Sequence, residues 1–326
     1  MTIDTLVRGV VLGGTGGVWQ IRTDDGETVD AALRGRLKKS NSGKRADGSL
    51  RRDTVAAAAE TLKLAVGDDV HLERGTRDDA WAISEILPRR SQLARRAPGG
   101  GQGERIVAAN VDQVVIVFAA AKPEPHPRML DRFLVIAEGN GLAARIIINK
   151  VDLVGEAAAH ERFAAYERVG YPVHYTAAKS GLGLESIRAM LGERRSVLTG
   201  PSGVGKSSLL NALFPGANLR VGAISESVNK GRHTTVGAVM LPLPNDNGYV
   251  IDTPGLREVG LWSLPAERLD ECFPELRALK DRCRFADCRH VAEPDCAVRD
   301  AVSRGEIDDA RYDSYCRLLE EIEAEA

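Results

Sequence analysis

The feature that most constrains the fold of this 326-residue chain is a glycine-rich loop at residues 200–208. It matches the P-loop pattern G-x-x-x-x-G-K-[S/T], with strand-like residues before it and an apolar helical pattern after it. The glycines let backbone N–H groups point at phosphate oxygens, at the positive end of the helix dipole. We therefore expect a nucleotide to contact Gly200, Pro201, Ser202, Gly203, Val204, Gly205, Lys206, Ser207 and Ser208. Lys206 would reach the β- and γ-phosphates, as a catalytic residue, and Ser207 would coordinate Mg²⁺.

A second motif indicates which base is bound. An apolar run at 145–148 ends in Asn149, Lys150, Val151 and Asp152, which form an N-K-x-D motif where ligands of open α/β sheets bind. The Asp152 carboxylate can accept two hydrogen bonds from guanine, a pair of donors that adenine lacks. After the next strand-like run, residues 176–181 loosely match an S-A-K loop, whose backbone contacts the guanine oxygen. This match adds Ala178 and Lys179 to the guanine site, and a plain strand–helix turn is the alternative.

Two further segments are expected to complete the Mg²⁺ and γ-phosphate site. A strand-like run at 249–251 leads into a D-x-x-G motif, in which Asp252 would hold Mg²⁺ through water and the Gly255 N–H would contact the γ-phosphate. The polar segment 229–235 offers a threonine to the Mg²⁺ shell, and we favour Thr235 over Thr234.

The residues around these motifs predict slow hydrolysis by the isolated chain. Leu256 follows the D-x-x-G motif, at the position where Ras-like enzymes have a glutamine that orients water. A partner that orders the neighbouring segments would then accelerate the reaction. His233 is the nearest titratable residue that could position or deprotonate water, and the alternative is that it only shapes its loop or touches RNA.

The N-terminal part is predicted to form a small β-structure with a basic insertion. Short β-rich runs before residue 92, separated by glycine turns, favour a barrel of the OB type. Between residues 34 and 52 the chain has eight basic residues and one acid. This charge favours contact with the RNA backbone, with a solvated basic loop as the alternative. The basic residues are Arg34, Arg36, Lys38, Lys39, Lys44, Arg45, Arg51 and Arg52.

The C-terminal part contains a candidate metal site. Three cysteines and a histidine fall within fourteen residues, and helical patterns at 264–279 and 301–322 flank them. Four soft ligands with no open position suit one structural Zn²⁺ per chain, whereas unrelated reduced cysteines are the alternative. Two other cysteines, Cys272 and Cys316, fall outside the spacing and are expected in the core. The expected zinc ligands are Cys283, Cys288, His290 and Cys296.

Composition limits the remaining classes. The net charge is −2, so any case for nucleic-acid binding must be local. The N-terminus lacks the pattern of a signal peptide, and the longest apolar run, 114–121, is too short to span a membrane. Five cysteines, an odd number, argue against a disulfide scaffold. We therefore expect a cytoplasmic protein without a membrane segment.

The motifs together resemble those of a GTPase, but the guanine-reading motif precedes the P-loop, as it does in circularly permuted GTPases. With a barrel before them and a Cys/His cluster after them, the chain resembles the RsgA (YjeQ) family, whose GTPases depend on the small ribosomal subunit. The resemblance is strongest at residues 109–113, 130–133 and 231–235 and in the cysteine cluster.

This resemblance implies a multidomain fold: an N-terminal OB-like β-barrel that binds RNA at 1–92, a circularly permuted P-loop α/β GTPase domain at 104–262, and a C-terminal α-helical zinc-binding domain at 263–326. It implies a monomer that hydrolyses GTP to GDP with Mg²⁺ during late maturation of the small ribosomal subunit. That subunit and its rRNA would be the partners and would stimulate hydrolysis. Two alternatives are a GTP-regulated RNA-binding module with negligible hydrolysis and a P-loop kinase.

Overall fold

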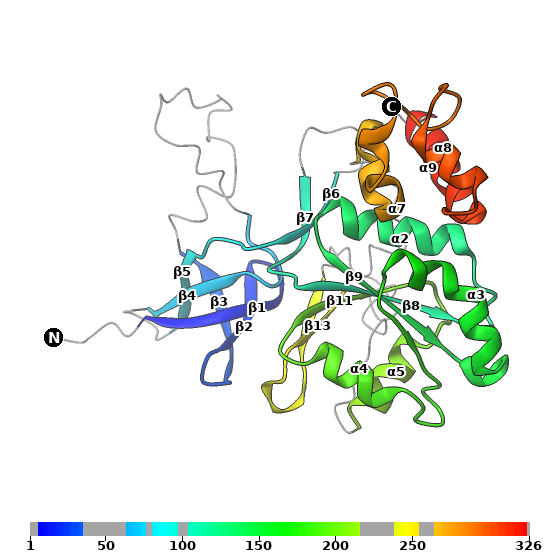
Figure 1. The fold of residues 1–326 in the computed structure, drawn as a ribbon. Helices are drawn as coiled ribbons and strands as arrows, with labels where there is room; N and C mark the ends of the chain where they lie inside the picture. Colours follow the sequence, from blue (N-terminus) through cyan, green and yellow to red (C-terminus); the bar gives the residue numbers. More distant parts are fainter. Residues whose placement is uncertain are drawn as a thin grey trace, which may run out of the picture.

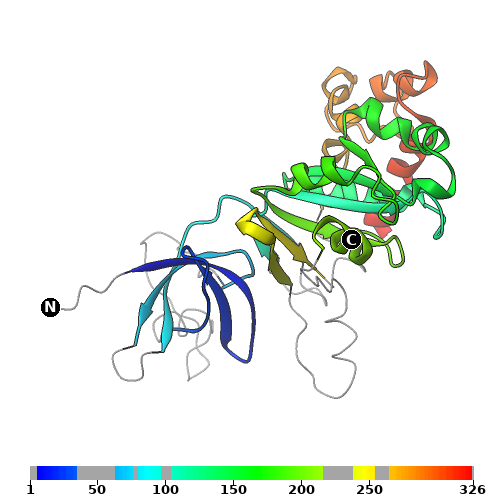
Figure 2. The same ribbon diagram turned by 90° about the horizontal axis from the view of Figure 1, so that it is seen from below.

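The computed structural model describes residues 6–34, 63–75, 80–96, 104–215, 238–253 and 264–324. The described chain forms a barrel, a central sheet covered by helices, and a C-terminal group of helices, in that order (Figure 1). Figure 2 shows the barrel and the C-terminal helices at opposite ends, with the sheet between them. Most of the basic insertion, residues 35–62, lies outside the described residues.

The N-terminal unit is a closed barrel of five strands, ordered β1-β2-β3-β5-β4. All of its pairings are antiparallel except β3 with β5. Alternate residues point inward, and the fully buried ones include Val11, Ile21 and Leu72. This arrangement confirms the predicted OB-like barrel. The strands are β1 (Val7–Thr15), β2 (Val18–Thr23), β3 (Thr28–Leu33), β4 (Asp69–Arg74) and β5 (Trp81–Ile86).

An antiparallel hairpin connects the barrel to the sheet. Its strands are β6 (Gln92–Arg96) and β7 (Glu104–Ala109). The central sheet then has the order β10-β9-β8-β11-β13-β12, and only the edge strand β12 is antiparallel to its neighbour. The strands are β8 (Gln113–Ala119), β9 (Ala143–Asn149), β10 (Val173–Tyr175), β11 (Arg195–Thr199), β12 (Val239–Pro242) and β13 (Tyr249–Asp252).

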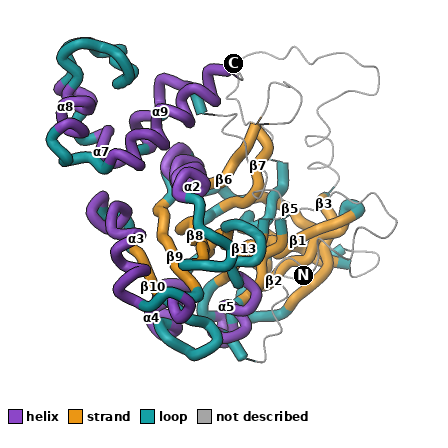
Figure 3. Tube along the Cα trace, turned by 90° about the vertical axis from the view of Figure 1, so that its right-hand side faces the viewer, coloured by secondary structure: helices purple, strands orange, loops and turns teal. Residues whose placement is uncertain are grey.

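Helices cover both faces of this sheet because its central strands are apolar on both faces. In β8, Ile116 and Phe118 pack beneath α2 (Pro127–Gly139) and α3 (Glu156–Val169). Val115 and Val117 pack in the core formed with α4 (Leu184–Leu191) and α5 (Lys206–Leu213). Figure 1 shows α2 on one side of the sheet and α4 and α5 on the other, and Figure 3 shows the same layers from the side. The continuous apolar strand that the sequence predicts is therefore confirmed.

The C-terminal unit packs on the outer face of α2 (Figure 1), and its core shares Val135 of that helix. The helical pattern at 264–279 is not one helix, because Pro274 in its interior lacks an N–H donor and begins a separate helix, α7. Cys272 is buried in this core, as expected. The elements are η4 (Ala266–Arg268), η5 (Asp270–Cys272), α7 (Pro274–Arg277), η6 (Lys280–Arg282), α8 (Ala297–Ser303) and α9 (Asp309–Ala324). Within the described ranges, no helix has the length and apolarity needed to cross a membrane.

Candidate nucleotide-binding and metal sites

The P-loop connects the end of β11 to the first turn of α5, and its backbone requires glycine. Gly200 has a φ of +131°, and a Cβ atom there would lie 2.1 Å from the carbonyl oxygen of Val117. Gly203 and Gly205 also have positive φ, at +78° and +96°. These conformations strongly favour glycine. They let the loop turn sharply at the carboxyl end of β11, where the N–H groups that begin α5 can meet an anion.

The side chain of Lys206 lies along this loop. Its Nζ donates hydrogen bonds to the carbonyl oxygens of Gly200 and Pro201, each at 2.7 Å. The residue is buried, so its charge is held at the loop and away from solvent. A positive charge at this place can interact with phosphate oxygens, as the motif predicts.

Asn149 joins the loop of the N-K-x-D motif to the P-loop. It ends β9, is 2% exposed, and its Nδ2 donates to the carbonyl oxygen of Val204 at 2.9 Å. Its Oδ1 accepts the N–H groups of Lys150 at 2.8 Å and Ala178 at 3.2 Å. One amide side chain thus holds together three segments that the sequence assigns to the nucleotide site.

The other residues of the N-K-x-D motif are arranged around this contact. Lys150 adopts a left-handed backbone with a φ of +61°, and its Nζ donates to the carbonyl oxygens of Gly203, at 2.7 Å, and Lys122. Val151 is buried, whereas Asp152 and Lys179 are exposed and can reach a ligand. The contact with Lys122 was missed at the sequence level because nothing in the local pattern connects residue 122 with the P-loop.

The strand carrying the D-x-x-G motif ends beside the P-loop strand. Asp252 is buried and lies opposite Leu198 in the parallel pairing of β13 with β11. Ser207 lies in the first turn of α5, on the other side of the loop. Their placement at one edge of the sheet suits a shared Mg²⁺ ion. The predicted residues His233, Thr235 and Gly255 lie outside the described part of the chain.

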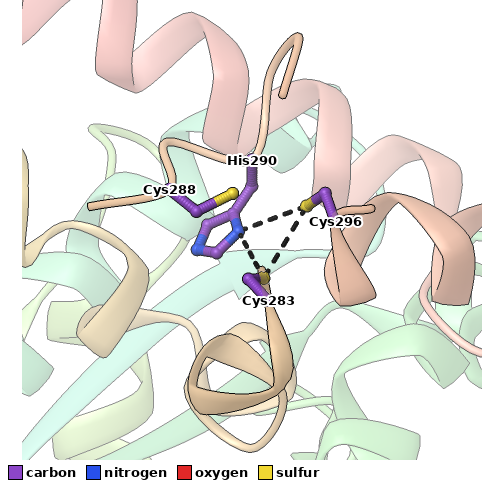
Figure 4. Close-up of side chains that lie close together, drawn as sticks. All are labelled: Cys283, Cys288, His290 and Cys296. Carbon is purple, nitrogen blue, oxygen red and sulfur yellow. Dashed lines mark hydrogen bonds between the residues drawn. The ribbon is translucent and has the colours of Figure 1, made fainter. Parts of the chain in front are cut away.

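The four predicted zinc ligands come together in the C-terminal unit (Figure 4). Their ligand atoms all lie within 4.8 Å of one another. The Nδ1 atom of His290 is 3.5 Å from the sulfur of Cys283 and 3.4 Å from that of Cys296. Cys288 supplies the third sulfur of the group. This donor set fits a four-coordinate soft divalent metal ion.

Hydrogen bonds to the backbone hold the ligand loop in place. The Glu293 carboxylate accepts the N–H groups of Arg289 at 2.7 Å and Val291 at 3.0 Å. Burial acts to raise the pKa of Glu293, but these backbone hydrogen bonds outweigh it and lower the pKa to about 2. From α9, the hydroxyl of Tyr312 donates to the carbonyl oxygen of His290 at 2.6 Å.

Without a metal ion, the thiols at Cys288 and Cys296 favour their protonated form. Burial raises the pKa of the Cys288 thiol to about 12, and burial also raises the pKa of Cys296. The neighbouring sulfurs disfavour a second negative charge in the same space. A divalent cation would compensate the thiolates, which is why such a cluster favours a bound metal.

The fold and the nucleotide site define a circularly permuted P-loop GTPase. The family model of the RsgA GTPase matches residues 86–262. The small ribosomal subunit biogenesis GTPase RsgA of Gemmatimonas aurantiaca is 55% identical over 319 residues, which cover 98% of each chain. The chain therefore belongs to the RsgA GTPase family.

Solved structures agree with this assignment. The crystal structure of YjeQ from Thermotoga maritima has a TM-score of 0.75 and 31% identity, and the match covers 97% of this chain and 98% of that one. YloQ, described as a circularly permuted GTPase, has a TM-score of 0.71 and 25% identity, with coverage of 100% and 98%. Similarity over nearly the full length includes the barrel and the C-terminal unit, so the family resemblance expected from the sequence is confirmed.

Proposed function

We propose that this chain hydrolyses GTP during late maturation of the small ribosomal subunit, and that the subunit stimulates the reaction. The observation that carries the GTPase part is the contact of Asn149 with Val204, which attaches the guanine-reading loop to the phosphate-binding loop. The ribosomal part rests on the relative from Gemmatimonas aurantiaca, which is a small ribosomal subunit biogenesis GTPase. The partners are then that subunit, its rRNA and guanine nucleotide, and the chain acts as a cytoplasmic monomer.

The proposed roles follow from the placement of the residues. Asp152 accepts two hydrogen bonds from guanine, and its exposed carboxylate leaves room for the base. Lys206 neutralises charge on the β- and γ-phosphates during in-line attack by water. Ser207, Asp252 and Thr235 would hold Mg²⁺, which supplies charge compensation between the phosphates. Gly255 contacts the γ-phosphate and His233 positions the water.

The metal bound by the Cys/His cluster is proposed to be one structural Zn²⁺. Three sulfurs and one imidazole nitrogen fill a tetrahedral shell and leave no position for a substrate. The ion would stabilise a loop that has exposed Arg284 and Phe285 in place of an apolar core. Metal analysis of the purified protein by mass spectrometry tests the identity of the ion.

The function is tested by measuring GTP hydrolysis with and without purified small ribosomal subunits. We expect strong stimulation by the subunits and its loss in Lys206→Ala. Asp152→Asn should shift the preference toward xanthosine triphosphate, because the amide presents a donor where guanine also has one. Glu185→Gln, an exposed substitution on α4, is the matched control and should behave as the wild type.

Each of the other possible outcomes would contradict a different part of the proposed function. Hydrolysis that ignores the subunits would refute the ribosomal partner and leave the GTPase in place. Undetectable hydrolysis even with subunits would favour a GTP-regulated RNA-binding module. Transfer of labelled γ-phosphate to a metabolite would favour the kinase.

A further inference from the structure

The two ring nitrogens of His290 face different partners. Nδ1 lies toward the sulfurs of Cys283 and Cys296, whereas the other ring nitrogen points away from them (Figure 4). That second nitrogen, Nε2, lies 3.6 Å from the Oδ2 atom of Asp270. The imidazole is 1% exposed, so water does not compete for either nitrogen. The ring therefore bridges the thiol cluster and one carboxylate.

Polar atoms at this contact lack ordinary hydrogen bonds. His290 Nε2 and Asp270 Oδ1 are both buried, and neither has a hydrogen-bond partner among the described residues. Leaving such atoms unpaired is unfavourable, so buried polar atoms normally find partners. A movement of less than 1 Å would close the contact between the ring N–H and the carboxylate. A carboxylate that accepts the free N–H of a metal-bound histidine is a common arrangement, and it fixes the ring and its tautomer.

The position of Asp270 is determined by the core beneath it. It begins η5, whose neighbours Leu269 and Phe273 are fully buried. The ring of Phe273 packs edge-on against Tyr315 of α9, with centroids 5.5 Å apart. The carboxylate therefore lies on a turn that is packed against α9.

The charges around the carboxylate also suit a hydrogen-bond acceptor. The Nζ of Lys280 lies 3.7 Å from Asp270 Oδ2 and 2.8 Å from Glu271 Oε1. Lys280 is too far from Oδ2 for a hydrogen bond, so this oxygen stays open to the ring N–H of His290. A carboxylate oxygen is only an acceptor, so a hydrogen bond at this contact places the ring proton on Nε2 and leaves Nδ1 as the nitrogen with a free lone pair.

We propose that Asp270 is a positioning residue of the metal centre, which accepts the Nε2–H of His290 and so makes Nδ1 the ligand atom. This inference rests on the proposed metal-binding role of the cluster. The spacing of the ligands in the sequence does not reveal this role of η5. Because η5 packs with α2 in one core, it also connects the metal centre physically to a helix of the GTPase sheet.

The test uses the full chain and three variants. Asp270→Ala removes the acceptor, Asp270→Asn keeps one acceptor oxygen, and Glu320→Gln, which changes an exposed carboxylate on α9, is the matched control. Zn²⁺ affinity is measured by competition with a chromophoric chelator, and the ring state of His290 by ¹⁵N NMR of the zinc-loaded wild type. Cobalt(II) absorption reports the coordination geometry. GTP-analogue binding reports whether each variant keeps its nucleotide domain.

We expect Asp270→Ala to bind Zn²⁺ roughly 10–100-fold more weakly, with Asp270→Asn between it and the wild type. Glu320→Gln should match the wild type, and NMR should show a protonated Nε2 with the metal on Nδ1. Wild-type affinity in Asp270→Ala, or metal on Nε2, would overturn the assignment. If Asp270→Ala fails to fold, Asp270→Asn and the wild-type NMR spectrum still decide. A wild-type chain that binds no metal would refute the metal role of the cluster itself.

Discussion

Arg311 of α9 forms a buried ion pair with Asp131 of α2, and this pair joins the C-terminal unit to the nucleotide-binding sheet. The two side chains are 3% and 1% exposed. Arg311 also makes a bidentate contact with Glu275 of α7, at 2.8 and 3.1 Å. Its guanidinium lies over the ring of Phe273, 4.7 Å from the ring centre. The buried guanidinium of α9 therefore contacts carboxylates on two other helices, α2 and α7.

Replacing this cation is expected to loosen the C-terminal unit. Arg311→Met leaves Asp131 and Glu275 buried without compensation, so we expect the free energy of unfolding to fall by about 3–5 kcal/mol. Urea denaturation followed by circular dichroism measures this change. Arg317→Met, which removes an exposed pair with Asp313 on the same helix, should change stability by about 0.5 kcal/mol or less. Equal effects of the two substitutions would contradict the structural role of the buried pair.

Some features of this chain depend only on residues that are neighbours in the sequence. The P-loop and the N-K-x-D motif were predictable because each depends on a few consecutive residues with a fixed backbone role. Their mutual contact through Asn149 follows from both lying at the carboxyl edge of one parallel sheet. The four metal ligands were likewise predictable from spacing alone, although their roles stay predictions.

Other features depend on contacts between residues far apart in sequence. Nothing near Asp131 or Asp270 indicates that a buried arginine or a histidine will face it. The helical pattern at 301–322 is also interrupted in the structure, because Gly305, with a φ of +71°, lies between α8 and α9. A periodic apolar pattern continues across such a break because both helices face the same core.

Adding one methyl group at Gly200 is expected to weaken nucleotide binding strongly. Gly200→Ala would bring Cβ to 2.1 Å from Val117 O at a φ of +131°, so the loop must move away from β8. We expect binding of a fluorescent GDP analogue to weaken by at least about 100-fold, equivalent to about 2.7 kcal/mol. Gly141→Ala is the control, since its φ is +65° with nothing within 4 Å of the added Cβ atom. Comparable binding by the two variants would refute the steric argument.

The link between the two nucleotide loops gives a separate prediction. Asn149→Ala removes the hydrogen bond to Val204 and leaves the N–H of Ala178 without its acceptor. We expect affinities for GDP and GTP to fall together by roughly 10–100-fold, because the loss affects the site before any chemistry. Calorimetric titration measures both constants. Asn211→Ala, on the exposed side of α5, should leave them unchanged, and a selective loss of GTP binding would argue against a purely architectural role.

Metal removal should affect the C-terminal unit and spare nucleotide binding. Without a cation, the four ligand side chains are no longer joined by a bound ion, so a strong chelator should make the loop 283–296 more accessible. Trypsin cleavage after Arg284 or Arg289, read by mass spectrometry, should then accelerate. Cys296→Ser should reproduce the effect, whereas Cys316→Ser, outside the cluster, should not. Unchanged cleavage on chelation would show that the loop needs no metal.

Hydrogen bonds connect the barrel to β11, the strand that leads into the P-loop, and the role of this junction can be tested. Arg195, the first residue of β11, donates to Gly67 O at 2.9 Å and to Asp69 Oδ1 at 2.7 Å. The backbone N–H of Arg195 donates a hydrogen bond to the carboxylate of Asp112 at 2.7 Å. Close approach is possible because residue 67 is glycine: a Cβ there would lie 2.2 Å from Ala109 O.

Arg195→Ala should therefore weaken the junction while the backbone of β11 keeps its place. Losing two hydrogen bonds of a charged donor is worth about 1.5–3 kcal/mol. Because the Ala109 N–H donates to Val66 O at 2.8 Å across this junction, its hydrogen exchange should accelerate by about 10–100-fold. Arg194→Ala, one residue earlier and exposed, is the matched control. If exchange at Ala109 stays slow in Arg195→Ala, the barrel is held by its apolar contacts, and the arginine does not set its position.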